Sequence, residues 1–343
     1  MQGLDDIQLR DILTRAIGPE RAGVALEAFH QPASVSVRIN PFKVDEPERF
    51  ARAHFKTEIR NVPWSPCGFM LGERPDFTLD PLFHCGCYYV QDSSAMVVGS
   101  IFRDMLQKIE DCFRPLRVLD LCAAPGGKST DLAASLRSTF GDDFLLVSNE
   151  VMRSRASVLA DNIALWGDPN VVVTSVDPKA FARLEGFFDI IVTDVPCSGE
   201  GMFRKDSKAV EDWSENVVNL CSARQRRILA DVWPALRRGG SLIYSTCTFE
   251  EAENDAVMEW VAGDLGGSFY EYDYSSLEGV VPTRTGGLLV PGFVKGEGQF
   301  VSALEKNTGV DGFRLSGKPA VGAAEKRKGN LLLHIPEAIV REV

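Results

Sequence analysis

Hydrophobic and polar residues alternate in blocks over the central part of this chain. Short apolar runs, each about as long as a buried strand, lie at 116–122, 144–149, 171–174, 187–194 and 240–246. Amphipathic segments of helical length separate or follow them, at 127–138, 151–166, 217–238 and 250–263. Buried strands that alternate with helices predict crossover connections and a doubly wound, mostly parallel sheet of the Rossmann-like α/β class.

The N-terminal part of the chain has a different pattern. Apolar positions recur at helical spacing in 5–17 and 20–30, and "SVSVRIN" at 34–40 alternates as a half-buried strand does. A short helix is expected in "EPERFARAHF" at 46–55. We therefore expect three parts: a small α/β domain over 1–85, the Rossmann-like domain over 86–306 with short edge strands near 286–291 and 298–305, and a polar linker and tail over 307–343.

Composition places the chain among ordinary globular proteins. Its 343 residues are 45% hydrophobic and 25% charged, with no apolar run long enough to cross a membrane and no secretion signal at the start. We expect a cytoplasmic monomer without a membrane partner. The eight scattered cysteines predict free thiols, and the "HCGC" cluster at 84–87 lacks the paired spacing of structural zinc sites, so no metal is expected.

The net charge of −11 argues against a general polyanion binder, because contacts to phosphate need Lys and Arg. A nucleic-acid enzyme with a local basic strip remains compatible with it. The candidate strips, some of which are expected to be solvated helix faces, are Arg153/Arg155, Arg204–Lys205–Lys208, Arg224–Arg226–Arg227 and Arg237–Arg238.

The segment "DLCAAPGGKST" at 120–130 ends like a phosphate-binding P-loop. A P-loop needs a glycine five residues before Gly127, where this chain has Cys122. Pro125 within the loop has no N–H to offer a phosphate. A P-loop ATPase is therefore disfavoured, and the segment is interpreted as a glycine-bearing turn of another kind after the first strand.

Ligands of such sheets bind beyond the carboxyl ends of the strands, where several acids are expected. Glu150 follows the second strand, where a carboxylate can accept hydrogen bonds from ribose hydroxyls or simply stabilise a helix N-terminus. Asp177 could accept from an adenine amino group or cap a helix. No phosphate-neutralising group other than Lys128 lies beside the loop, so a nucleoside without a pyrophosphate fits better than NAD.

Two cysteines are expected at the same edge of the sheet. "DIIVTDVPCSGEG" ends a buried strand with Asp194 and then Cys197, and "SLIYSTCTFEEAEN" ends another with Cys247 just before a predicted helix. A helix N-terminus stabilises a thiolate. Either cysteine alone could be inert packing, but two beside an aspartate and a cofactor loop indicate thiol nucleophile chemistry.

Together, "LDLCAAPGGKST", "DVPCSGEGMFRKD" and "YSTCTFEEAEN" resemble the NOL1/NOP2/Sun family of RNA cytosine-5 methyltransferases, which use S-adenosylmethionine. "SVSVRINPFK" and "YYVQDSSAM" resemble the segments ahead of that family's catalytic core, so the resemblance covers roughly 34–305. "SGEGMFRKD" followed by Trp213 is similar to the bacterial branch that modifies 16S ribosomal RNA. The resemblance implies a Rossmann-like class I methyltransferase and an RNA partner, either ribosomal RNA or the small ribosomal subunit.

The resemblance also implies a role for each candidate residue. Cys247 is the nucleophile, Cys197 assists product release, and Asp194 lies between cofactor and base. Glu150 holds the cofactor's ribose and Asp177 lies near its adenine, while Lys128 either contacts a ligand in the catalytic cleft or pairs with a nearby carboxylate. The loop expected to hold the methionine end of the cofactor consists of Cys122, Ala123, Ala124, Pro125, Gly126, Gly127 and Lys128.

Three further alternatives share the fold or the chemistry. One is a tRNA cytosine-5 methyltransferase. Another is an inactive RNA-binding assembly factor, but the presence of both cysteines argues against it. The third is a DNA cytosine-5 methyltransferase, in which the cysteine of the Pro-Cys motif would be the nucleophile. "LVPGFVKGEGQF" before the last strand lacks the Pro-His pair often seen there in the ribosomal branch. We expect RNA contacts from 1–85 and the basic strips of the core, or from a partner.

Overall fold

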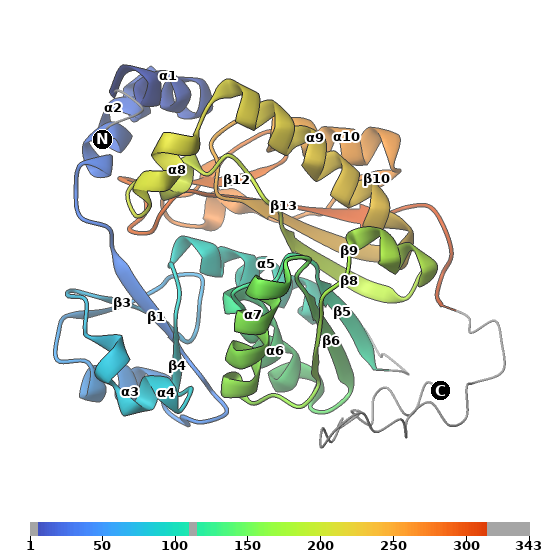
Figure 1. Ribbon diagram of the computed structural model, residues 1–343, viewed down its shortest axis with the longest axis horizontal. Coiled ribbons are helices and arrows are strands. Elements are labelled where there is room, and N and C mark those ends of the chain that lie inside the picture. Colours follow the sequence, from blue (N-terminus) through green and yellow to red (C-terminus); the bar gives the residue numbers. More distant parts are fainter. Residues whose placement is uncertain (1–5, 110–114, 314–343) are drawn as a thin grey trace.

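A computed structural model describes residues 6–109 and 115–313 of the chain (Figure 1). Two sheets organise this part: a small antiparallel sheet near the N-terminus and a nine-stranded mixed sheet. The predicted tail over 307–343 falls almost entirely outside the described residues, as does Cys112.

The small sheet has four antiparallel strands in the order β2-β3-β1-β4. Alternating inward residues of β1 and β3 meet the helix α3 in a separate hydrophobic core. The last strand, β4, ends beyond the expected boundary at residue 85, and the division of the chain into domains stays a prediction. The elements of this part are β1 (Val35–Ile39), α3 (Pro47–His54), β2 (Ile59–Asn61), β3 (Gly68–Leu71), α4 (Pro81–His84) and β4 (Tyr88–Val90).

The large sheet has the strand order β11-β12-β13-β9-β8-β5-β6-β7, with β10 paired to β13. Its five strands from β7 to β9 are parallel, which confirms the predicted doubly wound core. The first strand of this set, β5, lies beside β8, so the strand order reverses there and a ligand site is expected at that point. The parallel strands are β5 (Leu116–Asp120), β6 (Phe144–Asn149), β7 (Val171–Thr174), β8 (Phe188–Asp194) and β9 (Leu236–Thr246).

Successive residues of these strands enter different cores on the two faces. Val118 and Ile243 pack on one face against α5 and α6, whereas Leu119 and Leu242 pack on the other against α9 and α10. Figure 1 shows the two helix layers on opposite sides of the sheet. The covering helices are α5 (Val97–Gln107), α6 (Gly127–Phe140), α7 (Arg153–Trp166), α8 (Ser207–Asp212), α9 (Glu215–Val232) and α10 (Asp255–Asp264).

The first two helices, α1 (Asp6–Ile17) and α2 (Pro19–Phe29), join the large core rather than the small sheet. Leu9 and Leu13 are fully buried in the same cluster as residues of α9 and α10. Figure 1 places both helices beside α8 and away from the small sheet. The expected N-terminal part is therefore split, because its helices and its strands bury their apolar faces against different partners.

Two helices of the structure have other ends than the sequence predicted. The helix expected over 217–238 ends at Val232, because Pro234 follows and β9 already begins at Leu236. The helix expected over 250–263 begins only at Asp255, after a series of turns. The expected edge strands form β12 (Gly286–Leu289) and β13 (Gln299–Lys306), and both run antiparallel; β10 (Gly267–Phe269) and β11 (Val281–Pro282) complete the sheet.

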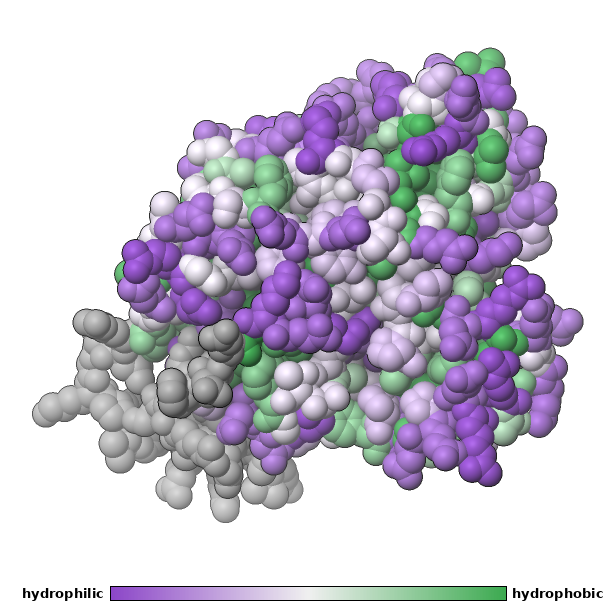
Figure 2. All heavy atoms as spheres, turned by 180° about the vertical axis from the view of Figure 1, so that it is seen from behind, coloured by the Kyte–Doolittle hydropathy of each residue, from purple (hydrophilic) through white to green (hydrophobic). Residues whose placement is uncertain are grey.

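Hydrophilic side chains cover most of the face opposite to the view of Figure 1, with smaller hydrophobic groups between them (Figure 2). Within the described residues, none of the helices combines the length and the apolar character that crossing a membrane requires.

Candidate active site

The loop between β5 and α6 is held in shape by neighbouring segments. Gly126 adopts the left-handed region with φ of 117°, and a Cβ there would lie 3.3 Å from Leu159. The backbone carbonyls of Ala124 and Pro125 accept hydrogen bonds from side chains of α7, Arg155 at 2.9 Å and Asn162 at 2.8 Å. The peptide bond between Ala124 and Pro125 is cis. The loop is thus a fixed part of the carboxyl edge of the sheet.

Arg38 of the small sheet reaches this loop from the other side. Its side chain is 1% exposed and donates to the carbonyl of Gly127 at 3.0 Å and to the hydroxyl of Thr130. Gln91 accepts from its Nε at 2.9 Å, and its guanidinium stacks 4.6 Å from the centre of the Trp166 ring. Sequence reasoning missed this residue. The alternation of "SVSVRIN" puts Arg38 on the polar side of the strand with Ser36 and Asn40, so no local signal indicated its burial.

Two acids lie at the ends of the next strands, as predicted. Glu150 is 3% exposed, and its carboxylate accepts from the backbone N–H of Met152 at 2.9 Å and lies 3.2 Å from Arg155. Asp177 is exposed and caps a short helix by accepting from the N–H of Lys179 at 3.0 Å. Both residues therefore stabilise the start of a helix, which was the alternative to ligand binding. A residue can have both roles.

Lys128 and Asp194 form an ion pair between the loop and the end of β8. The Lys128 Nζ lies 2.8 Å from Asp194 Oδ2, so the predicted pairing with a carboxylate is present. Burial lowers the pKa of Lys128, but the Asp194 carboxylate outweighs this effect and the pKa lies above its ordinary value. Asp194 Oδ1 also accepts from Ser245 at 2.8 Å and from Gln299 at 3.3 Å. Gln299 and Ser245 were not found from the sequence.

The two predicted cysteines meet at this edge. The Cys197 and Cys247 Sγ atoms are 3.1 Å apart, and the backbone N–H of Cys247 donates to Cys197 Sγ at 3.2 Å. The hydrogen bond with Cys247, together with burial, raises the pKa of the Cys197 thiol well above its ordinary value. Cys197 is therefore held as a protonated thiol beside the sulfur of Cys247.

A pair of glycines brings a third loop against the cysteines. The N–H of Gly201 donates to the carbonyl of Cys247 at 2.9 Å, and the N–H of Gly298 donates to the carbonyl of Gly201 at 3.1 Å. A Cβ on Gly201 would lie 2.5 Å from the Gly298 carbonyl oxygen, so neither position has room for a side chain. The loop that ends in Gln299 is thereby fixed beside Asp194.

Residues of several proposed basic strips form ion pairs with carboxylates of the same protein. Arg204 is buried and bonded to Glu297 at 2.9 Å, and Lys205 is paired with Asp92 at 2.6 Å. Two arginines of β9 are paired in the same way: Arg237 with Asp189, and Arg238 with Asp311. These strips therefore contribute to the fold more than to a basic surface.

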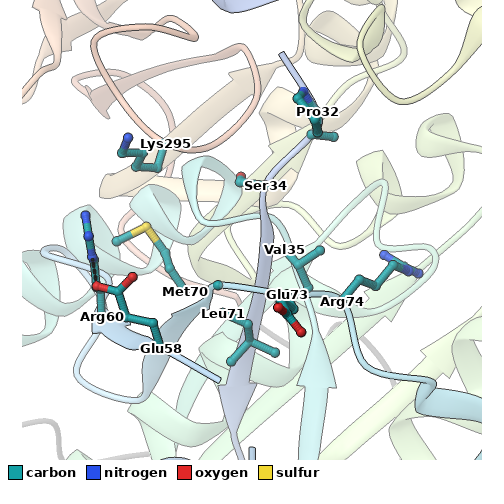
Figure 3. A pocket seen from close by; sticks show the side chains of 12 residues that line it. Pro32, Ser34, Val35, Glu58, Arg60, Met70, Leu71, Glu73, Arg74 and Lys295 are labelled. Atoms are coloured by element: carbon teal, nitrogen blue, oxygen red, sulfur yellow. Dashed lines mark hydrogen bonds and ion pairs between the residues drawn. The ribbon is translucent and has the colours of Figure 1, made fainter. Parts of the chain in front are cut away.

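An open cavity of about 460 Å³ lies between the small sheet and the loop that leads to Gln299 (Figure 3). The side chains of Arg60, Arg74 and Lys295 surround it, together with Glu58 and Glu73. It contains none of the predicted site residues. The loop carrying Lys295 continues directly to Gln299, which contacts Asp194, so cavity and cysteines are joined by one short segment.

The strand order and the fixed loop at the switch point define a Rossmann-like class I methyltransferase fold. A methyltransferase homologue from Pyrococcus horikoshii has a similar structure, with a TM-score of 0.70 and 25% identity over 86% of this chain and 93% of that one. NSun6 from the same organism, in a structure with SFG, also has a TM-score of 0.70, at 17% identity over 88% of this chain and 98% of that one, and shows the same fold.

Comparison with family models and curated relatives is more specific. The model described as 16S rRNA methyltransferase RsmB/F matches 111–265, and that for the N-terminal domain of 16S rRNA methyltransferase RsmF matches 13–93. The chain therefore belongs to the NOL1/NOP2/Sun family of methyltransferases, in its bacterial RsmF branch, and the predicted resemblance is confirmed. Methyltransferases of this family use S-adenosylmethionine.

Curated relatives carry the name ribosomal RNA small subunit methyltransferase F. That of Cronobacter sakazakii is 35% identical over 309 residues, which are 84% of this chain and 61% of the relative. That of Salmonella paratyphi B is 33% identical over 329 residues, which are 91% of this chain and 66% of the relative. The chain thus spans slightly less than two thirds of the length of these relatives.

Proposed function

We propose that this protein methylates C5 of a cytosine in 16S ribosomal RNA, with S-adenosylmethionine as methyl donor. The observation that carries the proposal is the pair of thiols 3.1 Å apart at the carboxyl edge of the sheet, beside Asp194 and the loop of 122–128. The relatives' printed names supply the substrate class. Residues from four separate segments converge there, which a purely structural role would not require.

The two thiols have different tasks in this reaction. Cytosine C5 is a weak nucleophile until the Cys247 thiolate adds to C6, which makes C5 enamine-like and able to take the methyl group. A base must then remove the C5 proton, and the electron pair expels the Cys247 sulfur from C6. Cys197 stays protonated beside Cys247 and is placed to return a proton to the departing thiolate, directly or through water.

Asp194 and Lys128 orient the base in this proposal. Asp194 already has three polar partners, which are Lys128 of the loop of 122–128, Ser245 of β9 and Gln299. Its carboxylate can accept a hydrogen bond from the exocyclic amino group of cytosine and stabilise the adduct. Lys128 Nζ pairs with that carboxylate at 2.8 Å and fixes its orientation, so its role is to position Asp194.

The residues present fit S-adenosylmethionine. The loop of 122–128 lies at the start of α6, and the Glu150 carboxylate lies at the end of β6, where ribose hydroxyls bind in such folds. Asp120, at the end of β5, is fully buried with one oxygen unpaired among the described side chains. Burial raises the pKa of Asp120 to about 7. When bound, the cofactor supplies an electrophilic methyl on a positively charged sulfur.

RNA contact is proposed for the cavity of Figure 3. Arg60, Arg74 and Lys295 are exposed around it, and the loop of Lys295 leads to the cysteine pair. Arg60 is paired with Glu58 at 2.8 Å, an exposed contact that a phosphate can replace. A target nucleotide must leave its stack to reach the cysteines, which favours a loop or locally opened helix as substrate.

The test is methylation of 16S ribosomal RNA, free and in small subunits, followed by mapping of 5-methylcytosine. We expect one modified cytosine, at C5, and a denaturant-resistant protein–RNA adduct. Methylation at an exocyclic nitrogen or a ribose would overturn the proposed chemistry. Methylation of tRNA but not of ribosomal RNA would favour the alternative substrate.

A further inference from the structure

Two buried carboxyl groups lie directly beneath the cysteine loops. Glu200 follows Cys197 by three residues and Glu253 follows Cys247 by six, and both residues are 0% exposed. Their carboxyl groups meet at one hydroxyl, because Ser198 Oγ lies 2.9 Å from both oxygens of Glu200 and also contacts Glu253 Oε1. The two acids are thus bridged by the residue next to Cys197.

A proton on one carboxyl group satisfies the hydrogen bonds at this bridge. The Ser198 hydroxyl has a single hydrogen, yet it lies between two acids that could each only accept if ionised. Glu253 Oε2 already accepts from Gln225 Nε2 at 2.6 Å and from the N–H of Ser198 at 3.2 Å. Glu200 accepts from Trp213 Nε1 at 2.5 Å. A consistent arrangement has a proton on Glu253 Oε1 donated to Ser198, whose own hydrogen goes to Glu200.

The surroundings favour a neutral acid as well. Glu253 interacts electrostatically with Glu200, Cys197, Cys221 and Tyr244, none of which carries a positive charge. Burial, which no cation among these neighbours offsets, raises the pKa of Glu253 to about 7.

The same cluster ties the two cysteine loops together. Thr248, next to Cys247, has its hydroxyl 3.0 Å from Ser198 Oγ. The Gln225 amide that binds Glu253 also donates to the carbonyl of Pro196 at 3.0 Å, immediately before Cys197. Glu253 therefore contacts the backbone after Cys197 directly and the backbone before it through Gln225, whereas its own segment follows Cys247.

We propose that neutral Glu253 is a positioning residue that holds Cys197 against Cys247 through Ser198, and that its ionisation loosens this arrangement. This proposal rests on the proposed function, because it concerns the same two thiols. Once Glu253 is ionised, two carboxylates face one hydroxyl hydrogen in a buried site, and their repulsion is relieved by separation of the loops. The catalytic thiols would then lose their contact.

The decisive comparison is between the wild type and Glu253→Gln, since a glutamine amide donates to Ser198 as the protonated acid does but does not ionise. Glu251→Gln, an exposed residue of the same turn, is the matched control. Single-turnover adduct formation on 16S ribosomal RNA is measured from pH 6 to pH 9. We expect the ratio of the Glu253→Gln rate to the wild-type rate to rise at least about fivefold across this range, with a constant ratio for the control. A constant ratio for Glu253→Gln would overturn the proposal.

A second readout separates this proposal from the proposed function. For an acid whose pKa is higher in the folded than in the unfolded chain, the folded state binds the extra proton, so stability falls as pH rises from about 4.5 toward 7. Glu253→Gln should flatten the pH dependence of Tm over that range, whether or not the wild type methylates RNA. If the Tm profile were unchanged in Glu253→Gln, Glu253 would not be a neutral acid and the proposal would be wrong. If the profile were flattened but the wild type formed no adduct, only the proposed function would be wrong.

Discussion

The sulfur atoms of Cys197 and Cys247 lie 3.1 Å apart, although the two residues follow different strands and are 50 positions apart in the chain. Parallel pairing of β8 with β9 produces this contact, because it aligns Asp194 with Ser245 at the ends of the two strands. Cys197 follows Asp194 by three residues, and Cys247 follows Ser245 by two. The sheet itself, rather than a flexible loop, sets the distance between the thiols.

Replacement of each thiol should give opposite results on RNA. We expect Cys247→Ala to lower methylation at least about 1,000-fold and to form no covalent adduct, because the nucleophile is absent. Cys197→Ala should form the adduct but release it slowly, which a slow-migrating band on a denaturing gel would reveal. Cys85→Ala, which removes an exposed free thiol, is the control and should behave as wild type. Loss of the adduct in Cys197→Ala alone would reverse the assigned roles.

Glu150 is expected to contribute to binding of the cofactor. A charged hydrogen bond to a ribose hydroxyl is worth about 1.5–3 kcal/mol, so Glu150→Gln should weaken S-adenosylhomocysteine binding by roughly 10- to 150-fold. Isothermal titration measures this change, with Asp161→Asn on the exposed side of α7 as control. Thermal stabilisation of the wild type by S-adenosylhomocysteine and not by ATP is expected as well. Unchanged affinity in Glu150→Gln would leave this residue with its structural role only.

Arg38→Met should destabilise the protein strongly. The substitution removes the donors to Gly127 and Thr130 and leaves Asp131 with one cation fewer, and the loss of a buried charged partner costs about 3–5 kcal/mol. Urea unfolding provides the measurement. Arg49→Met, at an exposed position of α3, should change stability by less than about 0.5 kcal/mol. A similar small change in both variants would show that the contacts of Arg38 contribute little.

Neutralising the cavity of Figure 3 should weaken RNA binding in a salt-dependent manner. If Arg60, Arg74 and Lys295 each contact a phosphate, changing all three to Gln should lower the slope of log K against log salt by about 2, since each contact to a single strand contributes roughly 0.7. Filter binding at several salt concentrations tests this. A double change of Arg49 and Lys56 to Gln, elsewhere on the small domain, should leave the slope unaltered, and equal slopes in both variants would exclude the cavity.

The sequence predicted the core of the sheet well because its strands are buried on both faces. A mostly apolar run such as 187–194 is typical of a strand buried on both faces, and glycine- and cysteine-bearing motifs mark the carboxyl ends of the strands. The edge of the sheet was less predictable. Strands β11, β12 and β13 pair antiparallel, and nothing in a short glycine-rich stretch specifies which neighbour it will join.

Contacts between distant segments could not be predicted. Arg38 meets Gly127 across 89 positions, and Ser198 meets Glu253 across 55. A single charged residue in an alternating strand, or a glutamate after a cysteine, has the same local pattern whether it faces solvent or a buried partner. The fold determines which applies, so the network beneath the cysteines became visible only with the structure.

The Arg38 guanidinium also determines how the protein can be divided. The small sheet supplies the donors that fix the carbonyl of Gly127, so a truncated protein that began after β4 would lack part of the wall of its cofactor loop. Such a fragment would retain every residue of the family motifs in the core and still bind the cofactor poorly. If the loop of 122–128 holds the methyl donor as proposed, the smallest unit able to bind it includes the strand that carries Arg38.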